Sequence, residues 1–481
     1  MEIKKPNRLF RWIREILDTF RQGNWAVKTS FFVFGVGNLY YGQIARGLLF
    51  LLFQIVFLVY MFLPSGGLYW LGKTKFFQTG ATVGDVQGHE AFHPVYDTAY
   101  WVPGDDSVKV LLYGLLTLLF ILAFFWTWRQ QIKQCRLCMD ITARGKGLPT
   151  AGDDLRGLAD RDFHKTLLAL PVLGILFFTV LPIIYMILIA FTSYDANHDG
   201  YANLFTWVGF DHFNALLDFG TGGLGLAFGE VLSWTLMWAF FATFTNYFLG
   251  ILVAVLINKR GIRLKKFWRT ILVLTIAIPQ FVSLLYVSRL LDATGFLGKL
   301  LLKWNLIPKA MLAANQLSLW SNPIAARITL ILVNIWVGIP YIMLIATGIL
   351  MNIPKDLYEA ARIDGANSFQ QYVRITMPYM LFVTGPYLLT SFVGNLNNFN
   401  VIYLLTGGNP LNTQVGVAGG VSVGSTDLLI TWLYRMTLGS AESKYYLASL
   451  IGILVFLVVA ILSLIVYNMI PSTRSEEDFR G

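Results

Sequence analysis

Eight long stretches of this chain carry no charged residue and no histidine, and they limit the folds that it can adopt. About 20 apolar residues are what an α-helix needs to cross the hydrocarbon core of a bilayer. Only 13% of the 481 residues are charged, against about 25% in soluble domains. A water-soluble globule is excluded, and an all-α polytopic membrane protein is predicted. Its eight transmembrane helices are expected at 47–63, 110–128, 166–191, 231–257, 270–288, 328–351, 380–405 and 447–470.

Positive charge is distributed unequally between alternate loops. If the amino terminus is cytoplasmic, the inside segments hold 27 of the 37 Lys and Arg residues. Those segments are 1–46, 129–165, 258–269, 352–379 and 471–481. Because cytoplasmic loops of membrane proteins carry the excess of Lys and Arg, both termini are predicted to be cytoplasmic. The net charge of +10 then reflects topology and anionic lipid rather than nucleic acid.

The stretches divide the chain into five regions. Residues 1–46 form a cytoplasmic and interfacial segment, in which Arg8 to Phe20 predict an amphipathic helix on the inner leaflet. Residues 47–128 hold two accessory helices joined by an extracellular loop. A basic cytoplasmic linker at 129–165 separates them from a six-helix core at 166–470. A cytoplasmic tail at 471–481 ends the chain.

Two short motifs suggest other chemistry. The run from His89 to His93 fits the zincin pattern, in which two His bind zinc and Glu activates water. A membrane metalloprotease using His89, Glu90 and His93 is therefore one alternative, although the surrounding Gly and Pro favour a loop and no metal site is expected. Residues 67–74 match a phosphate-binding loop. Bulky residues fill that match and its predicted position is extracellular, so it is interpreted as an ordinary polar exit from a span.

The lack of titratable groups within the stretches bears on the source of energy. Ion-coupled carriers and proton pumps hold acids, bases or His inside their spans, because these groups bind the driving ion. Backbone carbonyls at an unwound helix can also bind sodium, so an ion-coupled sugar carrier stays open as a second alternative. The favoured interpretation is that energy enters from outside the bilayer region.

Amides are the most polar side chains within the stretches. Gln280 lies in the fifth, Asn334 in the sixth, and four asparagines lie between 395 and 400 in the seventh. Amides facing lipid would be costly, so a protein-lined or water-filled cavity is predicted, with Asn395 and Asn398 on one helical face. Amides both donate and accept hydrogen bonds, which suits a neutral polyhydroxylated ligand such as a sugar. Hydrogen bonding between helices is the alternative.

The cytoplasmic loop at 352–379 predicts a helix, a turn and a second helix. Pro354 marks the start of the first helix and Gly365 its end, and Asn367 with Gln370 forms a capping box for the second. Spacing alone leaves open whether this loop docks on a partner.

Nine positions of this loop form a longer pattern: Glu359, Ala360, Ala361, Asp364, Gly365, Ala366, Phe369, Ile375 and Pro378. They resemble the EAA signature of permease subunits of binding-protein-dependent ABC importers, and the resemblance covers about 160–481. It implies a MetI-like permease core in a bacterial cell membrane, with Glu359, Ala360, Ala361, Asp364 and Gly365 coupling to a separate ATPase. It also implies a second, smaller EAA-bearing permease subunit, two copies of the ATPase and an extracellular sugar-binding protein. ATP and Mg would be held by the ATPase, and no cofactor by this chain.

Within that family, the residues at 334–341, 397–408 and 426–434 resemble the larger permease subunits of maltose and maltodextrin importers. The resemblance implies that the chain forms half of a path for maltooligosaccharides. The sugar-contacting positions that it implies are Ile276, Gln280, Asn334, Val337, Gly338, Gly394, Asn395 and Asn398. The side chains at 276 and 280 depart from the pattern, and the loop at 192–230 is too short for the domain that enterobacterial relatives insert there.

Overall fold

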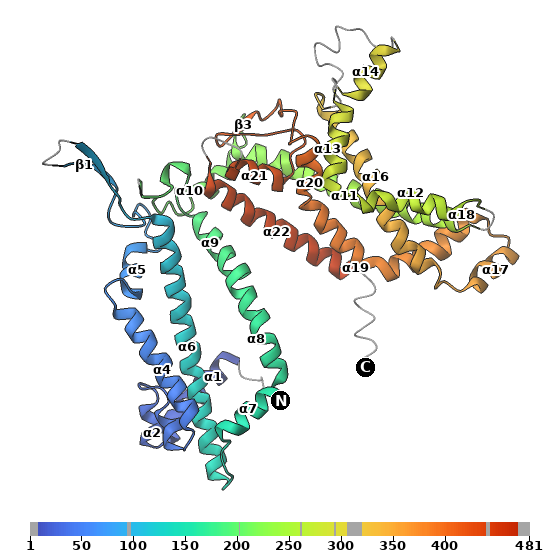
Figure 1. The fold of residues 1–481 in the computed structure, drawn as a ribbon. Helices are drawn as coiled ribbons and strands as arrows, with labels where there is room; N and C mark the ends of the chain where they lie inside the picture. Colours follow the sequence, from blue (N-terminus) through green and yellow to red (C-terminus); the bar gives the residue numbers. More distant parts are fainter. Residues whose placement is uncertain are drawn as a thin grey trace, which may run out of the picture. The chain divides into compact units, whose positions relative to one another are not determined.

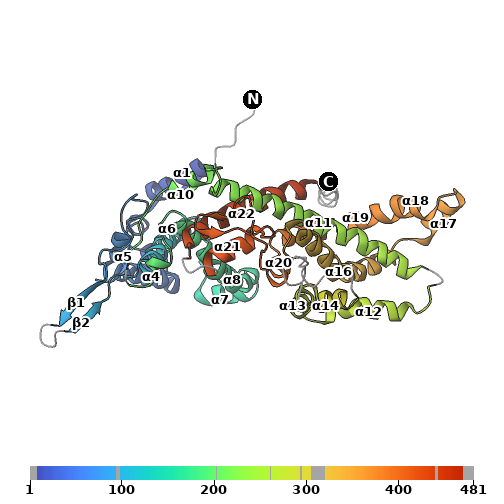
Figure 2. The same ribbon diagram turned by 90° about the horizontal axis from the view of Figure 1, so that it is seen from above.

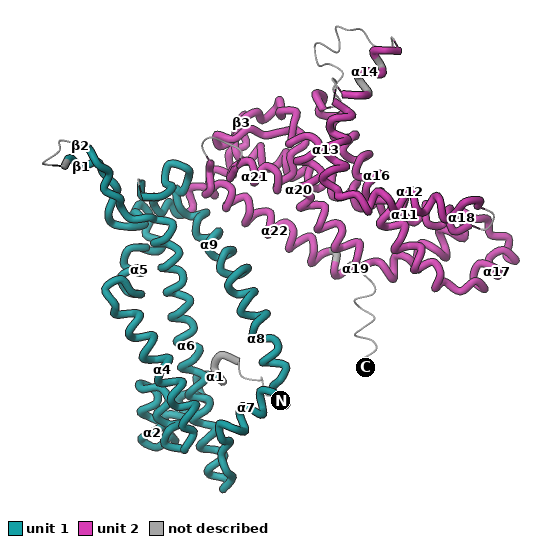
Figure 3. The backbone as a smooth tube through the Cα atoms, in the orientation of Figure 1, with its two compact units in different colours: residues 1–209 teal, residues 210–481 magenta. Residues whose placement is uncertain are grey.

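The computed structural model describes residues 8–93, 98–201, 203–259, 262–292, 295–304, 320–438 and 443–469. The chain forms two compact units, residues 1–209 and residues 210–481 (Figure 3). Within the described residues, each unit is helical apart from short antiparallel strand pairs. The predicted tail at 471–481 lies outside the described residues.

The first unit combines short N-terminal helices, long apolar helices and one strand pair (Figure 1). Its elements are α1 (Arg8–Gln22), α2 (Trp25–Thr29), α3 (Val36–Tyr40), α4 (Ile44–Phe62), α5 (Gly67–Thr74), β1 (His89–His93), β2 (Thr98–Val102), α6 (Ser107–Ala143), α7 (Ala151–Ala159), α8 (Phe163–Ile175), η1 (Leu176–Val180), α9 (Leu181–Ile189) and η2 (Ala196–His198). Phe57 of α4 stacks on Phe124 of α6, with ring centroids 4.0 Å apart. The Gln131 side chain of α6 forms hydrogen bonds with the backbone of Ser30 and Gly35. α6 therefore contacts both α4 and the segment between α2 and α3.

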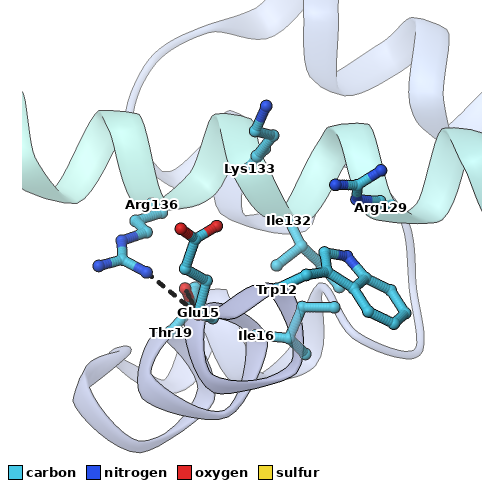
Figure 4. A pocket seen from close by; sticks show the side chains of 8 residues that line it. All are labelled: Trp12, Glu15, Ile16, Thr19, Arg129, Ile132, Lys133 and Arg136. Carbon is cyan, nitrogen blue, oxygen red and sulfur yellow. Dashed lines mark hydrogen bonds between the residues drawn. The ribbon is translucent and has the colours of Figure 1, made fainter. Parts of the chain in front are cut away.

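The helix predicted from Arg8 to Phe20 is confirmed as α1. Figure 4 shows Trp12 and Ile16 of α1 on the side of Ile132 of α6, beside basic side chains of α6. Other apolar residues of α1 remain exposed: Ile13, Leu17 and Phe20. An exposed apolar stripe suits contact with lipid, and its position on the inner leaflet stays a prediction.

The histidines of the metalloprotease alternative lie in a strand. β1 pairs antiparallel with β2, and His89 lies opposite Val102. A strand rises about 3.3 Å per residue, so the backbones of His89 and His93 are about 13 Å apart. One zinc ion holds each His nitrogen at about 2.1 Å, and this spacing does not support a zincin site. The loop expected here is a strand pair because 98–102 is rich in β-formers such as Tyr100 and Trp101.

The phosphate-loop match at 67–74 forms the helix α5 rather than a phosphate cradle. Lys73 makes an ion pair with Asp105 at 2.7 Å. Although burial acts to raise it, hydrogen bonds from Lys73 and from two backbone amides hold the pKa of Asp105 below its usual range. Because Lys73 is occupied by a carboxylate, it does not offer its charge to a phosphate.

The second unit is arranged around one long helix, α11 (Leu224–Asn258), which contacts α16 and α19 (Figure 1). Its other elements are α10 (Asp211–Asn214), η3 (Ala215–Leu217), α12 (Lys265–Ala277), α13 (Gln280–Leu291), α14 (Phe296–Lys303), α16 (Pro323–Leu350), α17 (Lys355–Ile363), α18 (Ser368–Gln371), η4 (Tyr372–Thr376), α19 (Met377–Leu396), α20 (Phe399–Leu405), β3 (Val417–Ala418), β4 (Val421–Ser422), α21 (Leu429–Leu438) and α22 (Tyr445–Met469). In both ribbon views α17 and α18 lie at one end of this unit (Figure 2).

Most of the predicted spans are confirmed as helices able to cross a membrane. Among the described residues six helices have the necessary length and hydropathy: Ile44–Phe62, Ser107–Ala143, Phe163–Ile189, Leu224–Asn258, Pro323–Leu350 and Tyr445–Ile465. A seventh candidate is the pair α12 and α13, which is bent by 95°. The bend lies at Pro279, and proline lacks the N–H that would continue a helix.

The predicted stretch at 380–405 is not one continuous helix. α19 ends at Leu396 and α20 begins at Phe399. The Asn398 side chain accepts a hydrogen bond from the Val401 amide at 3.3 Å, which starts a new helix as an N-cap does. The expectation that Asn395 and Asn398 share one helical face is therefore wrong, because the asparagine side chain competes for backbone groups.

Candidate functional site

A polar layer crosses the second unit between two apolar clusters. On α11 the first cluster ends at Ala242 and the second begins at Tyr247. On α16 the first cluster ends at Val333, apart from the partly buried Val337, and the second begins at Ile342. The predicted residue Asn334 falls between these limits on α16, and both Asn334 and Asn395 contact the same interval of α11.

The interval 242–246 of α11 contacts three of the predicted residues. Asn395 of α19 donates to the hydroxyl of Thr243 at 3.0 Å. Asn334 of α16 is buried and its amide nitrogen lies 3.5 Å from the carbonyl of Ala242. Gly338, one turn further along α16, lies against Asn246. Residues from three helices thus meet at one level of the unit.

Asn395 and Asn398 are neighbours despite the break between their helices. The Asn398 amide donates to the side-chain oxygen of Asn395 at 3.2 Å, while its own oxygen caps α20. A hydrogen-bonded row, here called the amide row, thus runs through Asn398, Asn395 and Thr243. It links α11, α19 and the start of α20. Both asparagines remain partly exposed, so donor and acceptor sites are left for a ligand.

The two predicted glycines of the site have opposite surroundings. A Cβ at Gly338 would lie 2.1 Å from the Asn246 amide nitrogen, so glycine there permits the close approach of α16 to α11. At Gly394 nothing lies within 4 Å of an added Cβ, and the residue faces open space. Gly338 therefore leaves room for the Asn246 side chain, and a side chain at position 394 would meet no described atom; the sugar-contacting roles of both glycines stay predictions.

Alanine at these two glycines is expected to separate the two roles. Gly338→Ala displaces the side chain of Asn246, whose oxygen is buried, and should lower the amount of folded protein modestly, since overpacking costs about 1–3 kcal/mol. Gly394→Ala should leave the amount of folded protein in the membrane unchanged. Gly394→Trp should also leave that amount unchanged but reduce the uptake of substrate. Quantitative immunoblots of membranes and uptake assays provide the measurement. Equal membrane amounts for Gly338→Ala and Gly394→Ala would contradict this assignment.

Ile276 and Gln280 lie on either side of the bend between α12 and α13. Both are exposed, and neither side chain hydrogen-bonds another described residue of the amide row. The backbone from 277 to 279 is also exposed, and non-helical backbone at membrane depth is found where it lines a cavity or is covered by protein. A sugar-contacting role for these two residues stays a prediction.

Two residues of α11 belong to this site but escaped the sequence interpretation. Thr243 is the partner of Asn395. The side-chain oxygen of Asn246 is buried without a hydrogen-bond partner among the described residues, which leaves an acceptor open at this site. Their spacing of three, inside an otherwise apolar stretch, is the signal that points to one helical face.

The loop predicted to couple with a partner is confirmed as two short helices. Asn367 and Gln370 form the predicted capping box, and Gly365 has the left-handed φ of +79°, which glycine adopts without strain. Glu359, Ala360, Asp364 and Gly365 are exposed, and Ala361 is half-buried.

A surface of apolar side chains surrounds these residues. Ile363 is 87% exposed and Phe369 is 73% exposed. Apolar groups this open to water on a short loop suit a protein partner.

One hydrogen bond ties the loop to the helix that carries Asn395. The hydroxyls of Tyr358 in α17 and Thr376 in η4 lie 2.9 Å apart. η4 continues directly into α19, which ends beside Asn395 and is held to α11 by the 2.7 Å contact of Thr384 with Tyr247. α17 is therefore linked through η4 and α19 to the polar layer.

Comparisons with known proteins agree with each other. The family model described as the inner membrane component of binding-protein-dependent transport systems matches residues 246–475. The chain is 31% identical over 92% of its length to the maltodextrin transport system permease protein MalC of Streptococcus pneumoniae, of which it covers 95%. It is equally identical, over 92% of its length, to the galactooligosaccharides transport system permease protein GanP of Bacillus subtilis, of which it covers 96%. Half of the chain is 34% identical to the maltose/maltodextrin transport system permease protein MalF of Escherichia coli, of which 45% is covered.

Proposed function

Because this chain belongs to the family of inner-membrane components of binding-protein-dependent transport systems, we propose that it forms half of the path of an ATP-driven importer of maltose- and maltodextrin-type oligosaccharides. The observation that carries this proposal is the row of Asn398, Asn395 and Thr243, which lies between two apolar clusters. Such a row offers donors and acceptors without charge, as a neutral sugar requires. The names of the MalC and MalF relatives support the same substrate class.

Energy for this transport enters through the loop at 352–379. Its exposed apolar and acidic residues suit docking on a cytoplasmic ATPase, which holds ATP and Mg while this chain holds no cofactor. The complete importer contains a second, smaller permease subunit, two copies of the ATPase and an extracellular sugar-binding protein. The uncharged spans support this arrangement over a proton-coupled carrier, since a proton relay requires titratable groups within the membrane.

The chain crosses the bacterial cell membrane eight times, with both termini in the cytoplasm. Six helices and the bent pair α12 and α13 supply seven crossings, and α19 with α20 supplies the eighth. The six crossings within 166–470 form the permease core. The distribution of Lys and Arg supports this orientation.

Loss of the gene is expected to abolish the uptake of radiolabelled maltotetraose supplied at micromolar concentration, and a plasmid copy should restore it. The same cells should take up a galactooligosaccharide of equal length at an unchanged rate, because a different importer carries it. Unaltered maltotetraose uptake in the deletion strain would contradict the proposal. Loss of galactooligosaccharide uptake instead would assign the substrate class of the GanP relative.

A further inference from the structure

A face of aromatic rings leads away from the amide row. α20 begins beside Asn398, and its residues Phe399 and Tyr403 stack with ring centroids 4.8 Å apart. Tyr434 of α21 meets both rings edge-on, at 4.9 Å from Phe399 and 5.2 Å from Tyr403. α20 has seven residues and spans about 10 Å, so this face connects the amide row to the far end of a short helix.

A polar cavity of about 360 Å³ opens at that far end. Its walls include Tyr403, Asn409, Ser422, Thr431, Tyr434 and Arg435. Binding sites for small molecules have volumes of about 300–1,000 Å³, so the cavity is large enough for a ligand. None of these six residues belongs to the amide row or to the surrounding polar layer at 242–246, 334–338 and 394–398.

The floor of the cavity is held by a buried ion pair. Arg435 lies 3.1 Å from the carboxylate of Asp427, whose side chain is fully buried. Asp427 also accepts from the Gly424 amide at 2.8 Å and from the Thr431 hydroxyl at 3.0 Å. Arg435 donates further to the carbonyls of Gly407 and Ser422. These contacts fix the position of the walls before any ligand binds, which limits the ordering cost of binding.

The charge and shape of the cavity indicate the kind of ligand. Arg435 is the charged residue of the walls, and Asp427, buried behind them, compensates its guanidinium, so the pair carries no net charge to favour an anion. Hydroxyl, amide and guanidinium groups supply hydrogen bonds, and the rings of Tyr403 and Tyr434 supply flat apolar surface. A sugar ring has hydroxyl groups at its edge and C–H groups on its faces, and it matches both features.

We propose that this cavity is a second saccharide subsite, which binds the glycosyl units of a longer oligosaccharide beyond those held at the amide row. The inference rests on the proposed function. α20 with its rings then forms the bridge between the two subsites. Under the predicted topology the segment 406–446 faces outside, so the subsite lies on the side from which the sugar arrives. A disaccharide occupies the amide row alone, whereas a tetrasaccharide reaches both.

The test compares two sugars in one assembled importer. Tyr403 is 43% exposed, so Tyr403→Ala removes the ring with little effect on the core, and Tyr403→Phe keeps the ring as a matched control. We expect the ratio of maltotetraose to maltose uptake, at saturating binding protein, to fall about five-fold in Tyr403→Ala, in line with the value of one aromatic contact. Tyr403→Phe should retain the wild-type ratio.

A second variant keeps the test independent of the folding of the first. Leu438 is 72% exposed at the rim of the cavity, and Leu438→Trp should partly fill it and lower the same ratio. An unchanged ratio in both variants, or an equal loss for both sugars, would overturn the second subsite. If the wild-type importer moves neither sugar, the proposed function itself fails, and this outcome is distinct from an unchanged ratio.

Discussion

A Glu359→Lys chain is expected to reach the membrane in normal amount and to import almost no saccharide. Glu359 is exposed on α17, so reversing its charge leaves the interior of the unit intact. Under the proposed function the same position would lie against the ATPase, where truncating one partner of a buried charge pair costs about 2–5 kcal/mol. Uptake should fall at least about 30-fold, as that range implies at about 1.4 kcal/mol per factor of ten.

The control for this variant changes an equivalent charge elsewhere. Asp160→Lys alters an exposed acid in the predicted cytoplasmic linker, outside the loop at 352–379, and should leave uptake at the wild-type level. Gly365→Pro offers a second lesion, because proline fixes φ near −65° where the chain requires +79°. Sugar uptake is measured in intact cells, and the amount of the chain is measured in membranes prepared from the same cells. Normal uptake by Glu359→Lys would contradict the coupling role of the loop.

An Asn395→Ala chain is expected to assemble but to respond weakly to sugar. The side chain of Asn395 touches Thr243 and Asn398, and its removal takes a donor and an acceptor from the polar layer. Hydrogen bonds to a ligand contribute about 0.5–1.5 kcal/mol each, so the sugar concentration for half-maximal ATP hydrolysis should rise about ten-fold. Asn398→Ala should have a similar effect and in addition lose the cap of α20.

Thr243→Val distinguishes binding from packing at this position. It removes the hydroxyl that Asn395 contacts but leaves the amide free for a ligand, so sugar-dependent hydrolysis should change less than two-fold. If the amide serves only to join α19 to α11, Thr243→Val and Asn395→Ala should have equal effects, of the size of one interhelical hydrogen bond, about 0.6 kcal/mol. Equal effects, or unaltered kinetics in Asn395→Ala, would favour the interhelical role.

The features that sequence predicted well depend on local chemistry. Uncharged stretches form helices because a backbone within a membrane must make its hydrogen bonds inside its own segment. The caps at Gly365 and Asn367 likewise act within a few residues. The break after Leu396 was missed because an asparagine inside an apolar run is equally compatible with a buried amide or with a cap. The choice is made by tertiary contacts, since Val401 and Leu405 of α20 lie in the first apolar cluster.

Other differences also come from neighbours distant in the sequence. The contribution of α11 to the site depends on Asn395, 152 residues away from Thr243, and no local pattern of α11 reveals that partner. Gly338 matched the sugar-contact pattern of the family, and only the structure reveals its neighbour Asn246 on α11; its sugar-contacting role stays a prediction. The histidine motif at 89–93 had the spacing of a zinc site, and pairing with β2 gave it the rise of a strand instead.

The most direct measurement uses sealed lipid vesicles. Vesicles that contain this chain and its smaller permease partner, with binding protein and radiolabelled maltotetraose on the outer side, should accumulate no sugar even with ATP inside. Adding the ATPase to the same vesicles should produce accumulation that depends on hydrolysable ATP. Sustained accumulation without the ATPase would show that this chain uses another source of energy and would contradict the account.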